Sequence, residues 1–162
     1  MIKKILCPTD FSEGSLEAIS FAGDIAVHAG AEIYLLHVIP IVPALVTDPS
    51  FTFTSPEMER SVSSEVQAEL KTIAEPLVAK DLPVRKFIGH GNAAPEIVRI
   101  ADREQVDVIV IATYGKTGWR RLVLGSVAEK VVRLATCPVI TVRARTRPAE
   151  DGRALKQQQV AS

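Results

Sequence analysis

Five short runs of aliphatic residues, spread over most of this 162-residue chain, constrain its fold more than any other feature. They are rich in Val, Ile and Leu and hardly alternate with polar residues, as is typical of parallel strands buried on both faces. Aromatic residues make up only 5% of the sequence, so aliphatic side chains must fill the core. The runs predict strands over 2–7, 32–38, 83–88, 106–112 and 138–142.

Helical periodicity occupies the segments between these runs. A first helix is predicted over 12–29, with Ser12 as its N-cap and Gly30 at its end. Further helices are predicted over 56–80, 94–104 and 126–135, and Ser126 with Glu129 matches a capping box at the start of the last one. The residues expected on the buried faces of the first and last helices are Leu16, Ile19, Ala22, Ile25, Ala26, Val127, Val131 and Leu134.

Strands that alternate with helices predict a single α/β domain, a Rossmann-like open parallel sheet with helices on both faces. A chain of this length can fold without a metal or a disulfide, and Cys7 and Cys137 lack CxxC spacing. We expect the domain to span 1–143. The remaining segment, 144–162, is polar and rich in charge, which predicts a disordered tail.

Charge and hydropathy exclude several classes of protein. Nineteen Lys and Arg balance nineteen Asp and Glu, and zero net charge argues against nucleic-acid binding. No run reaches about 18 apolar residues, so no membrane span is expected. The N-terminus lacks a signal-peptide pattern, and we therefore expect a cytoplasmic protein. From residue 143 the tail carries five basic and two acidic residues. Two interpretations stay open: the tail contacts an acidic partner, or it is a solvated end without a role.

The connection over 40–55 is unusually long for a compact domain. It contains three prolines and several large apolar residues. Connections of this length are usually functional or disordered. A lid, a dimer contact and a loop folded back onto its own core all stay open.

The strongest candidate site follows the fourth predicted strand. Glycines there let the backbone approach a ligand, cations add positive charge, and the N-terminus of the next helix suits phosphate. The residues concerned are Gly115, Lys116, Gly118, Arg120, Arg121, Gly125 and Ser126. The alternative is a turn that only connects two elements, with the Ser126 hydroxyl capping the helix.

Two familiar phosphate motifs fit poorly. Residues 115–117 resemble the end of a P-loop, but Val110 stands where its first glycine is required. Residues 89–94 match G-x-G-x-x-A, but they follow the third strand, and no acidic residue ends the next strand. A dinucleotide site is therefore disfavoured.

Polar residues also lie at the carboxyl ends of the first two strands. Asp10 could accept hydrogen bonds from a ribose hydroxyl or a base amino group, or it could shape the turn with Ser12 and help to cap the first helix. His37 is expected to be a hydrogen-bonded structural histidine, because the three histidines lack metal-ligand spacing. Cys7 lies in an apolar strand and is expected to be an inert buried thiol.

Several segments together resemble the universal stress protein family over 2–143. They are the first strand and turn at 4–12, LLHV at 35–38, DVIV at 107–110, GSVAEKV at 125–131 and CPVITV at 137–142. The family's nucleotide motif, Gly-x2-Gly-x9-Gly-[Ser/Thr], falls on Ala112, Gly115, Gly125 and Ser126. Ala112 replaces the first glycine, which adds a methyl group and excludes most positive φ angles.

The resemblance implies ATP binding between neighbouring strands one and four of a sheet ordered 3-2-1-4-5. The implied contacts are Pro8, Thr9 and Asp10 for adenosine, the Val38 backbone for adenine, Ile111 and Ala112 for ribose, and Gly115, Gly125, Ser126 and Val127 for phosphates that carry Mg²⁺ or Mn²⁺. We add Lys116 for its charge and position. The resemblance also implies a homodimer through the last strand, from Pro138 to Val142.

Three functions stay open at this point. The first is a homodimeric stress-response protein that binds ATP and responds to it by changing its protein partners, without efficient turnover. The second is a slow ATPase, and the third is an interaction dimer that binds no nucleotide. The predicted phosphate loop contains no Asp, Glu or His to activate water, which favours binding over catalysis.

Overall fold

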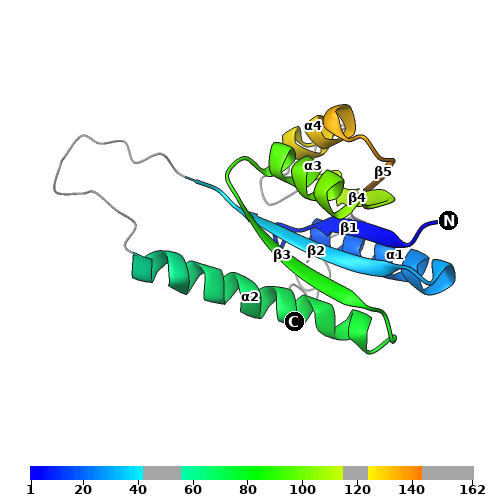
Figure 1. Cartoon of the computed structure of the whole chain (residues 1–162), viewed down its shortest axis with the longest axis horizontal. Coiled ribbons are helices and arrows are strands. Elements are labelled where there is room, and N and C mark those ends of the chain that lie inside the picture. The colour runs from blue at the N-terminus through cyan, green and yellow to red at the C-terminus, as the bar shows by residue number, and fades with distance from the viewer. Residues whose placement is uncertain (42–55, 115–123, 144–162) are drawn as a thin grey trace, which may run out of the picture.

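A computed structural model describes residues 1–41, 56–114 and 124–143, with side chains from residue 60 onward in the second range. The elements alternate as the sequence predicts (Figure 1). They are β1 (Lys4–Pro8), α1 (Glu13–Ala29), β2 (Glu32–Ile39), α2 (Pro56–Val78), β3 (Val84–His90), α3 (Ala93–Glu104), β4 (Val108–Ala112), α4 (Ser126–Leu134) and β5 (Val139–Val142). Most of the predicted 40–55 connection and the whole predicted tail lie outside the described residues.

The five strands form one parallel sheet in the order β3-β2-β1-β4-β5, which confirms the expected topology. Strand β1 pairs with both β2 and β4, so the direction in which strands are added reverses beside it. The carboxyl ends of strands at such a reversal border a crevice where open α/β sheets bind ligands. The candidate segments after β1 and after β4 therefore lie beside one another.

Each face of the sheet carries its own core. On one face, Ile5, Cys7 and Val110 pack with α1 and α2. On the other face, Leu6 and Ile109 pack with α3 and α4. Helices on both faces explain why the strand sequences are aliphatic without alternation, and burial raises the pKa of the Cys7 thiol, which makes it inert.

The buried faces of two helices differ from the prediction. In α1 the side chain of Leu16 is 41% exposed, because the buried face is centred on small residues such as Ala18, Ala22 and Ala26. In α4 the side chains of Val127 and Leu134 are 39% and 52% exposed. The buried residues of α4 are Ala128 and Val131, so the prediction is confirmed for Val131, and Ala128 takes the place in the core that was expected for Val127 and Leu134.

Candidate functional site

A cleft lies at the carboxyl ends of β1, β2 and β4, beside the N-termini of α3 and α4. Nine of the residues predicted for the site line it: Pro8, Thr9, Asp10, Val38, Ile111, Ala112, Gly125, Ser126 and Val127. Gly115 and Lys116, the other two, lie outside the described residues, as do Gly118, Arg120 and Arg121. Residues from β1, β2, β4 and α4 thus share one cavity wall, whereas Gly89 and Gly91 do not line it.

The turn after β1 is held by side-chain hydrogen bonds. One carboxylate oxygen of Asp10 accepts from the Ser12 backbone N–H at 3.1 Å and also from the Ser12 hydroxyl. The Ser12 hydroxyl oxygen in turn accepts from the Ser15 N–H at 3.3 Å, which caps α1 as predicted. Asp10 therefore shapes the turn, and it also lines the cleft.

Phe11 has an unusual backbone conformation beside the cleft, with φ at 63°. This left-handed region is unfavourable for a bulky side chain and persists only where surrounding contacts enforce it. The Phe11 N–H donates to the Thr9 hydroxyl at 3.0 Å, and the Phe11 ring stacks on His37 with centroids 4.3 Å apart. The turn is thus pre-organised by its neighbours.

His37 contributes to the cleft wall in a way that the sequence analysis missed. Its Nδ1 lies 2.8 Å from the Thr9 carbonyl oxygen. A carbonyl only accepts, so Nδ1 carries the proton, and Nε2 of the neutral ring is an acceptor. The predicted structural role of His37 is confirmed. Its position beside the carboxyl end of β1 was the signal that could have shown its place in the cleft wall as well.

The N-terminus of α4 is built differently from the predicted capping box. Gly125 is the N-cap, and its carbonyl accepts from the Glu129 N–H at 2.9 Å. Ser126 is therefore the first helical residue, and the prediction that its hydroxyl caps the helix is wrong. The N–H groups of Ser126, Val127 and Ala128 have no acceptor within the helix, and all three residues line the cleft.

Gly125 allows α4 to approach β4 closely. Its N–H donates to the Thr113 carbonyl oxygen at 2.7 Å, and a Cβ built on Gly125 would lie only 2.8 Å from that oxygen. The φ of Gly125 is −71°, so the requirement for glycine here is steric and does not depend on backbone conformation. This contact positions the free N–H groups of α4 over the cleft.

Ala112 does not disturb the cleft. It is absent from the non-glycine residues with positive φ, which in the described chain are Phe11, Asp81 and Gln105. Its methyl group packs in the core on the α1 side, whereas Ile111 belongs to the core on the side of α3 and α4. The backbone conformation at this motif position therefore does not require glycine.

The walls of the cleft combine apolar surface with few charges. Leu36, Val38, Ile97 and Ile111 supply apolar side chains. Among its described residues only Asp10, His37 and Tyr114 are ionisable, and none is Lys or Arg. Positive potential at the described wall must come from the N-termini of α3 and α4, whose first residues, Ala93 and Ser126, both line the cleft.

One buried polar atom in the cleft wall is unsatisfied. The hydroxyl oxygen of Thr113 has no hydrogen-bond partner in the described structure. Such groups are rare, and each one suggests a missing partner such as a ligand or a water molecule. Together with the free N–H groups of α4, it makes the cleft a fit for a ligand with oxygen acceptors, such as phosphate.

The described residues contain neither a cluster of metal ligands nor a helix that could span a membrane. No group of three or more His, Cys, Asp and Glu side chains there could hold a metal ion by itself. Within those same ranges, no helix combines the length and the apolar composition needed to cross a membrane.

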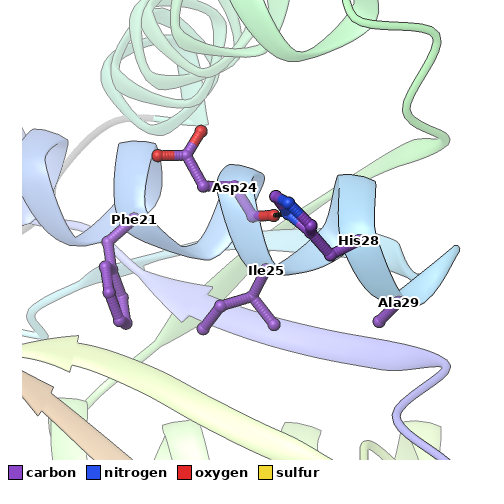
Figure 2. Close-up of a pocket in the computed structure, with 5 residues that line it drawn as sticks. All are labelled: Phe21, Asp24, Ile25, His28 and Ala29. Atoms are coloured by element: carbon purple, nitrogen blue, oxygen red, sulfur yellow. Dashed lines mark hydrogen bonds between the residues drawn. The ribbon is translucent and has the colours of Figure 1, made fainter.

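A second, shallow hollow lies beside α1 (Figure 2). It is lined by Phe21, Asp24, Ile25, His28 and Ala29, and Phe21 and Ile25 point to the same side of the helix. The polar side chains do not converge, because the His28 ring bonds the Asp24 carbonyl of its own helix at 2.7 Å. This hollow resembles an apolar contact surface more than a binding site for a small polar molecule.

Comparisons with known proteins agree with this architecture. The model of the universal stress protein family matches residues 1–143. Universal stress protein MJ0531 of Methanocaldococcus jannaschii is 38% identical, over 88% of this chain and 83% of the relative. The solved structure of hypothetical protein MJ0577, from the same organism, superposes with a TM-score of 0.78 at 32% identity and covers 91% of this chain and 99% of that one.

A more distant structure shares the fold. The universal stress protein from Archaeoglobus fulgidus, solved in complex with dAMP, superposes with a TM-score of 0.62 at 21% identity. The match covers 87% of this chain and 97% of that chain.

Proposed function

The chain belongs to the universal stress protein family, and we propose that it binds ATP in the cleft between β1 and β4. In this proposal the protein is a homodimeric regulator of the stress response that changes its protein partners when nucleotide binds. The observation that carries the proposal is the set of three free N–H groups at the N-terminus of α4, placed over a cleft with apolar walls.

The phosphate end of the proposed ligand lies against α4. Free N–H groups at a helix N-terminus donate to phosphate oxygens, and the helix dipole favours the negative charge. Ser126 is an exposed residue, and its hydroxyl is not used as a cap, so it can donate as well. A bound Mg²⁺ or Mn²⁺ would neutralise phosphate charge, with the phosphate oxygens as its main ligands.

The adenosine end lies toward β1 and β2. Val38 and Ile111 provide apolar surface for the base, and the Val38 backbone is the proposed partner of adenine. Asp10 and the Nε2 atom of His37 are acceptors suited to ribose hydroxyls or the adenine amino group. Pro8 and Thr9 complete this end, and the complex of the Archaeoglobus fulgidus protein with dAMP supports an adenine nucleotide as the ligand class.

The Ala112 substitution is compatible with the proposal. Its φ is not positive, and its methyl group packs toward α1, so the motif position contributes its backbone in the same way as glycine would. The described cleft residues also argue against efficient hydrolysis. The one carboxylate among them, Asp10, is engaged by Ser12 in the turn after β1.

We further propose that β5 mediates the homodimer. It is an edge strand that pairs only with β4 in the described structure. Exposed apolar side chains lie on the helices that contact it, Phe21 on α1 and Val132 and Leu134 on α4. An edge strand flanked by apolar surface favours pairing with a second chain.

The nucleotide content of freshly purified protein tests the binding proposal. The protein is denatured, and the supernatant is separated by anion-exchange chromatography and compared with the protein concentration. Stoichiometric ATP, or a thermal shift with Mg-ATP that Mg-GTP does not match, supports the proposal. Protein without nucleotide that also shows no shift at millimolar Mg-ATP refutes it.

A Thr141→Pro variant tests the dimer. The carbonyls of Pro138 and Val142 are bonded toward β4, so the alternation along β5 directs the backbone groups of Thr141 outward. Proline removes that outward N–H and leaves the ladder with β4 intact. Light scattering should report a monomer with an unchanged circular dichroism spectrum, whereas a dimer of wild-type stability would refute pairing through β5.

A further inference from the structure

Thr113, the residue directly after β4, has a buried hydroxyl without a hydrogen-bond partner in the described structure. The residue is 6% exposed, and its backbone is fully engaged. Its N–H donates to the Val142 carbonyl at 2.8 Å, and its carbonyl accepts from the Gly125 N–H at 2.7 Å. A buried unpartnered hydroxyl disfavours folding, and valine would fill the same space without that cost. The hydroxyl therefore calls for a partner beyond the described residues.

Thr113 lies on the cleft side of the sheet. Val110 and Ala112 pack toward α1, and Ile109 and Ile111 pack toward α3 and α4. Thr113 stands at the bend that follows β4 and lines the cleft together with Ile111 of the second set. It lines the cleft, and its carbonyl holds the N-cap of α4. The hydroxyl thus lies on the same side as the free N–H groups of α4.

We propose that Thr113 is a phosphate-contacting residue whose hydroxyl donates a hydrogen bond to the phosphate held at the N-terminus of α4. This inference rests on the proposed nucleotide binding and adds a specific side chain to it. A threonine hydroxyl can donate, and phosphate oxygens are strong charged acceptors. The hydroxyl oxygen is covered from solvent in this structure. Contact therefore involves a rotation about χ1 to another staggered rotamer, which exchanges the positions of Oγ1 and Cγ2.

The inference links stability to binding. Without a ligand the unpartnered hydroxyl lowers the stability of the folded protein, and phosphate binding satisfies it. A variant without the hydroxyl should therefore gain stability in the absence of ligand and lose affinity for nucleotide. A residue with a purely structural role would not show these two opposite effects together.

The test compares full-length wild type with Thr113→Val and Thr113→Ser. Each protein is stripped of nucleotide, melted, and titrated by calorimetry with Mg-ATP and separately with adenosine, which lacks phosphate. We expect Thr113→Val to melt about 2–4 °C higher than wild type and to bind Mg-ATP about tenfold more weakly. Adenosine affinity should stay within about twofold of wild type for this variant, and Thr113→Ser should retain wild-type affinity for Mg-ATP.

The possible failures are distinguishable. If Thr113→Val binds Mg-ATP like wild type, or loses affinity for adenosine to the same extent, the phosphate contact is refuted and nucleotide binding is not. A lower melting temperature for ligand-free Thr113→Val would show that the hydroxyl already has a partner, which also refutes the inference. If wild type binds neither ligand, the proposed function fails, and this inference fails with it.

Discussion

Replacing Gly125 with alanine tests whether the N-terminus of α4 holds the phosphates. The added Cβ would lie 2.8 Å from the Thr113 carbonyl oxygen, whereas ordinary contacts begin at 3.4 Å, so the two atoms must separate by about 0.6 Å. The oxygen belongs to the backbone of Thr113, whose own N–H is bonded to β5, and it cannot rotate away. We therefore expect α4 to shift outward and its hydrogen bond to Thr113, now 2.7 Å, to weaken.

The magnitude follows from the two contacts that are disturbed. Steric overpacking and a weakened buried hydrogen bond each cost about 1–3 kcal/mol when they are not relieved. For a chain of this size, each kcal/mol lowers the melting temperature by about 2–4 °C. Displacement of the free N–H groups of α4 should weaken Mg-ATP binding at least about tenfold, since such charge-assisted bonds depend on geometry.

A Gly30→Ala variant is the matched control. Gly30 ends α1 with φ at 64°, and a Cβ there would meet nothing within 4 Å. Alanine in this left-handed conformation costs about 1–2 kcal/mol through the backbone alone, and Gly30 does not line the cleft. Both variants should melt lower, and only Gly125→Ala should lose affinity in calorimetry. Wild-type affinity of a destabilised Gly125→Ala protein would refute the assignment of the phosphate site to α4.

Three further outcomes are expected. Ala112→Gly should change the Mg-ATP dissociation constant less than about twofold, because the Ala112 methyl packs away from the cleft. The same variant should lose about 0.5–1 kcal/mol of stability through the backbone freedom of glycine. A tenfold gain in affinity would contradict this expectation. The Asp107 carboxylate accepts from the Lys3 and Lys4 N–H groups, which lowers its pKa. The contribution of this carboxylate to folding stability is therefore fully present above the pKa that Asp107 has in the unfolded chain, and it is lost as the pH falls through the lower pKa of the folded protein. When the pH is lowered from 7 to 3, urea unfolding should show a smaller loss of stability for Asp107→Asn than for wild type. Deleting 145–162 should leave the melting temperature unchanged, and a drop of many degrees would show that this segment is packed.

The start of α4 shows where sequence patterns reach their limit. Ser126 and Glu129 match a capping box, yet Gly125 occupies the N-cap position. A capping pattern describes only local hydrogen bonds. The helix start was decided by the contact between Gly125 and Thr113, residues that belong to different elements. The same contact explains why glycine is needed at position 125, which the sequence analysis attributed to phosphate alone.

The cleft shows the same division between local and distant information. Asp10, Gly125 and Ser126 could be predicted, because they follow strands of recognisable pattern and match a family motif. His37 and Thr113 were not predicted as cleft residues. Their significance depends on hydrogen bonds made, or left unmade, with atoms far away in the chain, such as the bond from His37 to Thr9.

The sequence by itself determined the alternation of strands and helices and the α/β fold class. Those properties follow from the periodicity of apolar residues, which is local and is set by how each element exposes its side chains. Only the tertiary structure decided that the Ala112 methyl faces α1 and that Thr113 and the first residues of α4 line the same cleft. The physical reason is that such properties depend on parallel pairing between distant segments, as when β1 pairs with β4 about a hundred residues later.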